Sequence, residues 1–544
     1  MTGTTLQRAH IRMQQVVRLI MAIGLLLGVT SAFADNEETT LLVWAGDVAH
    51  IAPDFVAVID FDPNSASYGK VLSTVPLAGR SAIGNEPHHV GISNDGRTVA
   101  LGGLLSVLRG QDQVFFYDVT DPRHPTFLHS NNPPQASITD EFAALSSGGF
   151  LVTFMGGGNG ANPGRVVEYD AGHNVVKVWP TTPPTDGFNP HGLSLDEAHN
   201  LMITSDFICP AHTLLIPGGG GVAMRGSVRV WDLARRAVTR TISVGTPTHP
   251  AGTMDVQLIP HDPLLRAFTA GMADNNLYLI DTQKGTAKAV FNFGSLAVGN
   301  APAMPQLLRI NKQGTRLFIT VNGAGKVAML DITSPEQPKV LSVVDLGPGS
   351  GPHFLRLTGD EQRLVVTDYF LVEDLAPPGV VNADGDHKIH VINVQGNRLE
   401  LDARFDVDFN RDIGTGPARP HGVVPLPFLA TPVDVSFQVR VTRGGFRFDH
   451  ASGRFVQSVT LTNTGPSPIM GPISLVLDSL SLDAALYNQT GLTSATLPAG
   501  RSYLVVQSAD LAVGASASAR LEFTDSTLAA ITYTPRVLAG PGMR

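Results

Sequence analysis

The stretch Gly-Asn-Glu-Pro-His-His, residues 84–89, decides how the rest of the chain is interpreted. Its Pro-His step returns ahead of later apolar runs, as Asn189-Pro190-His191-Gly192, Gly351-Pro352-His353-Phe354 and Arg419-Pro420-His421-Gly422. Each step opens an apolar run that predicts a β-strand, and after the first three an Asp/Gly-type turn and a second run follow. We therefore expect the four steps to occupy equivalent positions in a repeated β unit.

The repeat has a period of about fifty residues, a length typical of one small sheet in a repeat protein. Complete units cover 88–119, 140–170, 191–232, 254–281, 306–331 and 353–393. One such sheet cannot bury both of its faces alone, whereas radial stacking of several sheets buries them and leaves only short edges. The pattern favours a β-propeller over a β-sandwich or a solenoid with similar repeats.

The two ends of this region supply one more unit. Predicted strands at 41–44 and 55–60 lack an innermost partner, and 421–426 is an innermost strand with nothing after it. Joined in one sheet, they complete a unit and close a ring. We therefore predict an all-β fold with a seven-bladed β-propeller over residues 35–429, in which histidines distant in sequence converge on one axis.

Residues 430–544 differ in composition, being rich in Thr, Ser, Val and Leu and free of Pro-His steps. Alternating runs such as 455–463 and 516–523 predict strands separated by turns. They indicate an immunoglobulin- or fibronectin-like β-sandwich. Because this segment offers no cluster of His, Asp or Glu, we expect an accessory domain.

Residues 1–34 are typical of an export signal peptide. Three arginines precede the apolar run 19–29, and Ala-Phe-Ala at 32–34 gives a small-x-small cleavage site before Asp35. A membrane anchor is the alternative, although the run is short for a bilayer span. We expect a periplasmic or secreted protein with no membrane span after cleavage.

Charge and cysteine content exclude several classes of function. The net charge of −9 is spread over 544 residues without a Lys/Arg-rich run, so nucleic acid is not an expected partner. Cys209 is the single cysteine, which excludes an internal disulfide and a cysteine-based zinc site. We expect it to be a small buried side chain and not a reactive thiol.

Aligned units bring five histidines to one level of the predicted axis: His88, His89, His191, His353 and His421. Met254 and Gln306 occupy this level in two other units, and Asp140 with Glu141 in a third. Imidazole is the commonest protein ligand for transition metals, so the alignment predicts a metal site. The alternative is that Pro-His caps a strand and its histidine bonds the neighbouring unit.

Two carboxylates are expected beside these histidines. Glu86 and Glu141 can orient imidazoles as hydrogen-bond acceptors, and they are the candidate catalytic groups for moving protons. His212 and His249 are weaker candidates for lining the mouth of the channel.

The opening of the repeat region resembles the selenium-binding protein family, which includes bacterial copper-dependent methanethiol oxidases. The matching segments are Leu42-Val43-Trp44-Ala45-Gly46-Asp47, Pro53-Asp54-Phe55, the run 58–65, Tyr68-Gly69-Lys70-Val71, the pair His88-His89, the run 200–207 and His421. The resemblance covers about residues 40–427. It implies a seven-bladed propeller, oxidation of methanethiol to formaldehyde, hydrogen sulfide and hydrogen peroxide, and a metal site at His88, His89 and His421.

The chain also departs from the family pattern. A further histidine of the third blade is replaced by the stretch 137–141, and the family's reactive cysteine near the N-terminus has no counterpart. His191 and His353 are additions that the resemblance does not explain.

Three functions remain open. The first is an exported oxidase of a small thiol that uses copper, or else iron or another transition metal. The second is a propeller that binds a ligand or partner without turnover. The third is a metal-dependent hydrolase or lactonase, since one fold supports many activities. The sequence does not indicate the oligomeric state.

Overall fold

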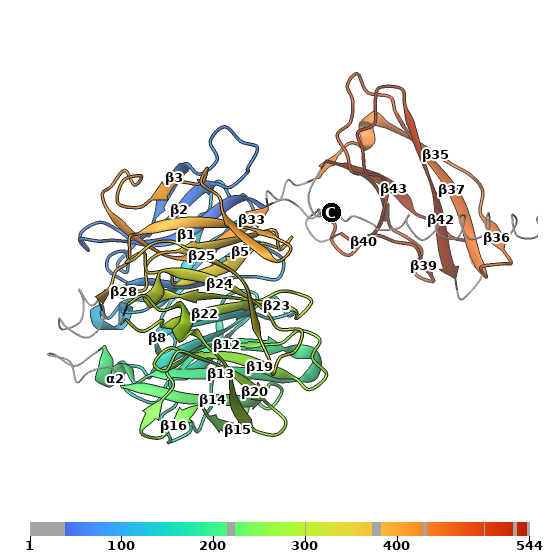
Figure 1. Cartoon of the computed structure of the whole chain (residues 1–544). Coiled ribbons are helices and arrows are strands. Elements are labelled where there is room, and N and C mark those ends of the chain that lie inside the picture. Colours follow the sequence, from blue (N-terminus) through green and yellow to red (C-terminus); the bar gives the residue numbers. More distant parts are fainter. Residues whose placement is uncertain are drawn as a thin grey trace, which may run out of the picture. The chain divides into compact units, whose positions relative to one another are not determined.

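The computed structural model describes residues 38–214, 223–299, 301–372, 382–427, 432–493, 496–525, 530–540 and 544. Within these ranges the regular secondary structure is almost entirely β-strand (Figure 1). The described helices are short: α2 (Pro210–Thr213) and the 3-10 helices η1 (Ser106–Arg109), η2 (Glu197–His199), η3 (Phe293–Leu296), η4 (Asn322–Ala324) and η5 (Ser436–Gln438). None of these helices approaches the length and hydropathy needed to cross a membrane. The predicted signal peptide lies outside the described residues.

Five four-stranded antiparallel sheets are each built from consecutive strands. They are β4 (Pro87–Ile92), β5 (Thr98–Gly103), β6 (Val114–Asp118) and β7 (Thr126–Asn131); β8 (Ser137–Ala144), β9 (Phe150–Gly156), β10 (Arg165–Tyr169) and β11 (Val175–Trp179); β12 (Pro190–Asp196), β13 (Leu201–Ile208), β14 (Met224–Asp232) and β15 (Ala237–Ser243); β18 (Thr253–Leu258), β19 (Arg266–Gly271), β20 (Asn276–Asp281) and β21 (Thr286–Asn292); and β22 (Pro305–Ile310), β23 (Arg316–Val321), β24 (Lys326–Asp331) and β25 (Lys339–Asp345).

A sixth sheet and two short hairpins complete the consecutive elements. The sheet contains β26 (Phe354–Leu357), β27 (Arg363–Thr367), β30 (Lys388–Gln395) and β31 (Arg398–Leu401), with β32 (Val407–Asp408) beside β30. The hairpins are β16 (Gly245–Thr246) with β17 (His249–Pro250), and β28 (Leu371–Val372) with β29 (Asn382–Ala383).

The two ends of this region share one sheet. It contains β3 (Val71–Pro76), β2 (Phe55–Asp60), β1 (Glu38–Asp47) and β33 (Ala418–Pro427). β33 pairs antiparallel with β1, and Leu41 lies opposite Pro425. Figure 1 shows the orange β33 beside the blue β1. The prediction that the last innermost strand completes the first unit is confirmed.

The first strands of the sheets contact one another in a closed cycle. The order is β33, β4, β8, β12, β18, β22, β26 and again β33. Burial follows this arrangement: the third strand β2 and the second strand β13 are buried throughout, whereas the fourth strands β3 and β15 are exposed or half-buried at every position except Ile242. A strand that is buried on both sides lies between neighbouring sheets, so the sheets pack face to face around their first strands.

Residues 432–544 contain two further five-stranded sheets within the described ranges. One consists of β34 (Val433–Asp434), β43 (Thr534–Ala539), β38 (Ile473–Asp478), β41 (Ser502–Gln507) and β40 (Gly491–Leu492). The other consists of β35 (Val439–Arg443), β37 (Arg454–Asn463), β42 (Ser516–Asp525) and β39 (Ala484–Leu486), with β36 (Arg447–Asp449) beside β37. Leu461, Leu475 and Phe523 belong to a hydrophobic cluster of their own.

Candidate metal centre

An irregular step in the strand pairing recurs where the first strands carry polar residues. In β4 the register with β5 shifts across His88 and His89. The same shift occurs in five other first strands, at Asp140, His191, Asp255, Gln306 and His421. Consecutive residues of a regular strand point to opposite faces, whereas a bulge re-aims a side chain. The rings of His88 and His89 accordingly stack, with centroids 4.5 Å apart and planes within 4°.

Threonine hydroxyls fix the backbone at the same level. Three threonines in second strands donate to the backbone carbonyl of a histidine in the next sheet: Thr153 to His191 (2.5 Å), Thr320 to His353 (2.9 Å) and Thr367 to His421 (2.6 Å). The glycine after His421 is needed for close approach, because a Cβ at Gly422 would lie 2.6 Å from the carbonyl oxygen of His88. Neighbouring sheets therefore hold these histidines in register.

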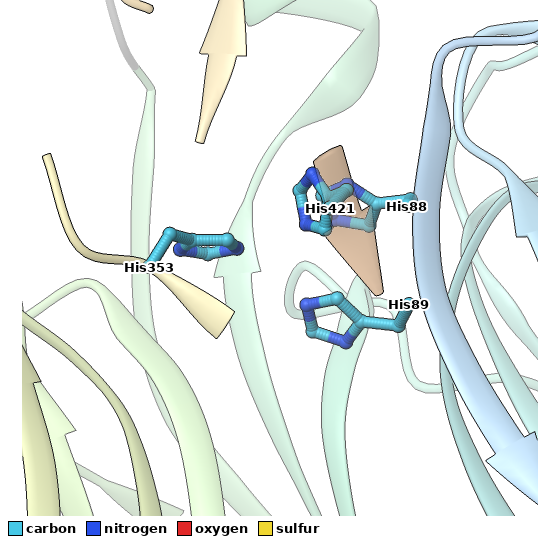
Figure 2. A group of neighbouring side chains, drawn as sticks. All are labelled: His88, His89, His353 and His421. Atoms are coloured by element: carbon cyan, nitrogen blue, oxygen red, sulfur yellow. The ribbon is translucent and has the colours of Figure 1, made fainter. Parts of the chain in front are cut away.

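Four imidazoles from three distant segments converge at the axis, as Figure 2 shows: His88, His89, His353 and His421. We call them the tetrahistidine set. One ring nitrogen from each lies within 4.8 Å of the others, and each residue is at most 1% exposed. The ring centroids of His88 and His421 are 4.1 Å apart, and those of His353 and His421 4.7 Å.

A second group of potential ligands adjoins the first: His88, His89, Asp140 and His191, which we call the carboxylate set. Oδ1 of Asp140 lies 3.2 Å from Nε2 of His191, 3.3 Å from Nδ1 of His89 and 3.8 Å from Nε2 of His88. All five histidines predicted from the repeat therefore lie in one continuous cluster, to which the structure adds Asp140.

Two hydrogen bonds orient the tetrahistidine set. Nδ1 of His89 lies 2.9 Å from Oε2 of Glu141, and Nδ1 of His353 lies 2.6 Å from Oε1 of Gln306. A carboxylate or amide oxygen that accepts from Nδ1 leaves Nε2 deprotonated and available to a metal. Both Nε2 atoms indeed have no hydrogen-bond partner.

The cluster contains an unusual number of buried polar atoms without hydrogen-bond partners. They are Nδ1 of His88, Nε2 of His89, Nδ1 of His191, Nε2 of His353, both ring nitrogens of His421 and both carboxylate oxygens of Asp140. Leaving one such atom unpaired costs about 1–3 kcal/mol. A bound cation would satisfy several of them at once, so the donor set fits a metal.

Burial determines the charge state of these groups. It lowers the pKa of His88, His191, His353 and His421 well below the usual value, and the neighbouring imidazoles add to the effect for each. The neutral imidazole is the form that binds metals. At Glu141 burial acts to raise the pKa, but the Arg309 guanidinium, 3.5 Å away, and the hydrogen bond from His89 outweigh it, so its pKa falls to about 2.

The two predicted carboxylates have different neighbours. Glu141 bonds an imidazole, as expected, whereas the buried Glu86 accepts a hydrogen bond from the hydroxyl of Tyr369. The Tyr369 ring lies 5.8 Å from the His421 ring. Tyr369 was not among the sequence candidates, because a tyrosine after a buried strand carries no distinctive signal.

The remaining sequence candidates lie apart from both ligand sets. His249 is exposed in β17 and contacts Thr248, and His212 lies in the short helix α2. Cys209 is buried, as predicted, and its sulfur accepts a hydrogen bond from the Asn162 amide. Sequence reasoning placed Gln306 and Asp140 at the axial level without giving either a role.

The third group of potential ligands consists of Asp368, Asp386 and His390. We interpret it as a structural ion-pair network. Oδ2 of Asp368 lies 2.9 Å from Nε2 of His390, and Lys388 already neutralises Asp386 at 3.0 Å. Asp206 and Arg229 make the equivalent link between second and third strands in the sheet of β12–β15.

Comparison with known proteins gives a consistent family. The model of the 56 kDa selenium-binding protein family matches residues 29–425. The chain is 24% identical over 404 residues to a methanethiol oxidase of Hyphomicrobium sp, covering 70% of this chain and 86% of that protein. It is 24% identical over 440 residues to mouse selenium-binding protein 2, covering 68% and 89%. The crystal structure of a hypothetical selenium-binding protein from Sulfolobus tokodaii shares the fold, with a TM-score of 0.58, 19% identity, and coverage of 71% of this chain and 93% of that one.

Proposed function

The chain belongs to the 56 kDa selenium-binding protein family, and on that premise we propose that it is a copper-dependent oxidase of a small thiol. One observation carries the proposal: the buried tetrahistidine set, whose ring nitrogens lie within 4.8 Å of one another. Relatives named methanethiol oxidase make methanethiol the first substrate to test. The proposed reaction converts methanethiol, oxygen and water into formaldehyde, hydrogen sulfide and hydrogen peroxide, which balances in atoms and electrons.

The scaffold that we propose is a seven-bladed β-propeller over residues 35–429, followed by an immunoglobulin-like β-sandwich over 430–544. The closed cycle of first strands and the sheet shared by β1 and β33 support the first part. The separate hydrophobic cluster of the later sheets supports the second. In this scaffold four of the axial histidines lie within strands of the sheets, and His353 immediately precedes β26.

Copper is the metal that we assign to the tetrahistidine set. Its donors are all neutral imidazoles, which suit copper and also zinc, iron and nickel, so iron or another transition metal is the alternative outcome. When bound, the metal would supply a position for the substrate thiolate and a path for its electrons to oxygen. Glu141 and Gln306 would hold His89 and His353 in the required tautomer.

The acidic side chains near the histidines have two different roles in this proposal. Glu141, with a pKa of about 2, stays ionised at neutral pH and is fixed by Arg309, so we assign it an orienting role. Glu86 and Tyr369 are bonded to each other beside His421, and we assign them the transfer of the thiol proton away from the substrate.

We also propose that residues 1–34 direct export to the periplasm or the medium. The arginines, the apolar run and the Ala-Phe-Ala site support this. Terminal sequencing of protein recovered from the non-cytoplasmic fraction should find Asp35 first. Intact protein confined to the cytoplasm would argue against export.

The main test measures metal content and turnover in the same preparation. Copper-loaded protein should retain copper after desalting, and with methanethiol it should consume oxygen and release formaldehyde, sulfide and peroxide. His421→Ala should lose both copper and turnover. The matched control is His124→Ala, whose side chain is 80% exposed and distant in sequence from every ligand.

Two results would overturn the proposal. The first is a folded protein that holds no metal after copper loading. The second is a loaded protein with no turnover of methanethiol or of other short thiols, which would leave binding or hydrolysis as the function.

A further inference from the structure

The axial cluster contains more potential ligands than one metal ion can bind. His191 belongs only to the carboxylate set, and His353 and His421 belong only to the tetrahistidine set. Asp140 is likewise absent from the tetrahistidine set. A single ion within reach of His353 and His421 therefore leaves Asp140 and His191 without a partner.

The distances around Asp140 are those of ligands that share an ion. A charge-assisted hydrogen bond between nitrogen and carboxylate is about 2.7–2.9 Å long. Oδ1 of Asp140 lies 3.2 Å from Nε2 of His191, and this contact does not satisfy the oxygen as a hydrogen bond. Two ligands bound tetrahedrally at about 2.0–2.1 Å are about 3.3 Å apart. The spacing thus matches coordination better than a salt bridge.

The surroundings of Asp140 offer no other compensation for its charge. Its neighbour Glu141 is bonded to His89 and paired with Arg309, and Asp255 is paired with Arg309 at 3.0 Å. Both oxygens of Asp140 lack a hydrogen-bond partner although the residue is fully buried. Burying a carboxylate without a donor costs free energy unless the group binds a proton or a cation neutralises it.

We propose a second cation position formed by Asp140, His191 and His88, next to the tetrahistidine set. The inference rests on the proposed function, because it deepens the same metal centre. Two imidazoles and one carboxylate suit a divalent borderline ion such as Zn²⁺ or Cu²⁺, whereas the tetrahistidine set has no anionic ligand. Nε2 of His88 lies 3.8 Å from Oδ1 of Asp140, and Nδ1 of the same ring has no hydrogen-bond partner. The ring therefore lies between the proposed second position and the tetrahistidine set.

The experiment counts metal ions per chain in full-length protein that is stripped and then reloaded with copper(II) alone or zinc(II) alone. Elemental analysis after desalting should give two ions per chain in the unmodified protein. Asp140→Asn and His191→Gln should each hold one ion, and so should His353→Gln. Circular dichroism of every variant checks that the fold is kept, and Asp140→Asn is nearly isosteric.

Each outcome decides between the two proposals. One ion per chain that is lost in His353→Gln and kept in Asp140→Asn refutes the second position and leaves the oxidase proposal standing. One ion that both variants lose means a single shared site and also refutes it. One ion kept in His353→Gln and lost in Asp140→Asn supports the position of Asp140 and refutes the tetrahistidine site. No ion in the unmodified protein refutes both.

Discussion

Two buried polar clusters in the same β region make an instructive contrast. Arg229 in β14 is 0% exposed, yet its guanidinium bonds Asp206 at 2.6 Å, Asp186 at 2.8 Å and Thr241 at 2.7 Å. The axial histidines are equally buried, but several of their ring nitrogens have no partner. A cluster whose buried polar groups hydrogen-bond one another stabilises the fold. A cluster whose buried polar groups have no partners calls for another explanation, such as a bound ion.

The strongest test of this contrast removes the centre of the satisfied cluster. Arg229→Ala leaves Asp206 and Asp186 without their cation, and breaking a buried pair in this way costs about 3–5 kcal/mol of unfolding free energy. Chemical denaturation of the metal-free protein measures it. Arg235→Ala is the control: the side chain is 81% exposed, so the loss should stay below about 1 kcal/mol. Equal losses would remove the basis of the comparison.

The next test alters the hydrogen bonds that orient the axial histidines. Glu141→Gln should weaken copper binding about 10- to 100-fold, because partners of metal ligands typically contribute that much. Gln306→Leu should fall at the lower end of this range, since a neutral hydrogen bond is weaker than a charge-assisted one. Competition with a chromogenic chelator measures both affinities. An unchanged affinity in both variants would mean that His89 and His353 are not ligands.

A smaller effect is expected from the bonds that join neighbouring sheets. Thr367→Val keeps the shape of the side chain but leaves the backbone carbonyl of His421 unpaired, and should cost about 1–2 kcal/mol of stability. The control is Thr462→Val, which loses an exposed hydrogen bond to Ser516 and should have little effect. If the two variants unfold at the same denaturant concentration, the sheets do not depend on this bond.

The last test concerns a partly satisfied acid, whose effect on stability depends on pH. Burial raises the pKa of Glu38 to about 7, against the opposing hydrogen bond from the Gly359 backbone amide. Because the folded-state pKa lies above the unfolded value, Glu38 favours folding most at low pH, and this contribution is lost as pH rises from about 4.5 to about 7. Glu38→Gln should flatten the pH dependence of stability between about pH 4.5 and 7, which urea titrations at several pH values measure. Parallel curves for the two proteins would contradict the shift.

The repeat could be predicted because it follows from local patterns in the sequence. Apolar runs, turns and the recurring Pro-His step place the strands near 88, 191 and 421, and the incomplete units at both ends predict the pairing of β1 with β33. The roles of individual polar residues could not be predicted in the same way. Glu86 and Glu141 look alike in the sequence, yet one bonds Tyr369 and the other His89.

What the sequence alone determined is the level at which the histidines meet, since equivalent positions of a repeat return to the same place in each sheet. What only the tertiary structure decided is which atoms face one another there. Bulges turn both His88 and His89 toward neighbouring side chains, bring Asp140 beside His191 and set Gln306 behind His353. A one-residue irregularity reverses the side to which a residue points, and it depends on packing between sheets that are remote in sequence.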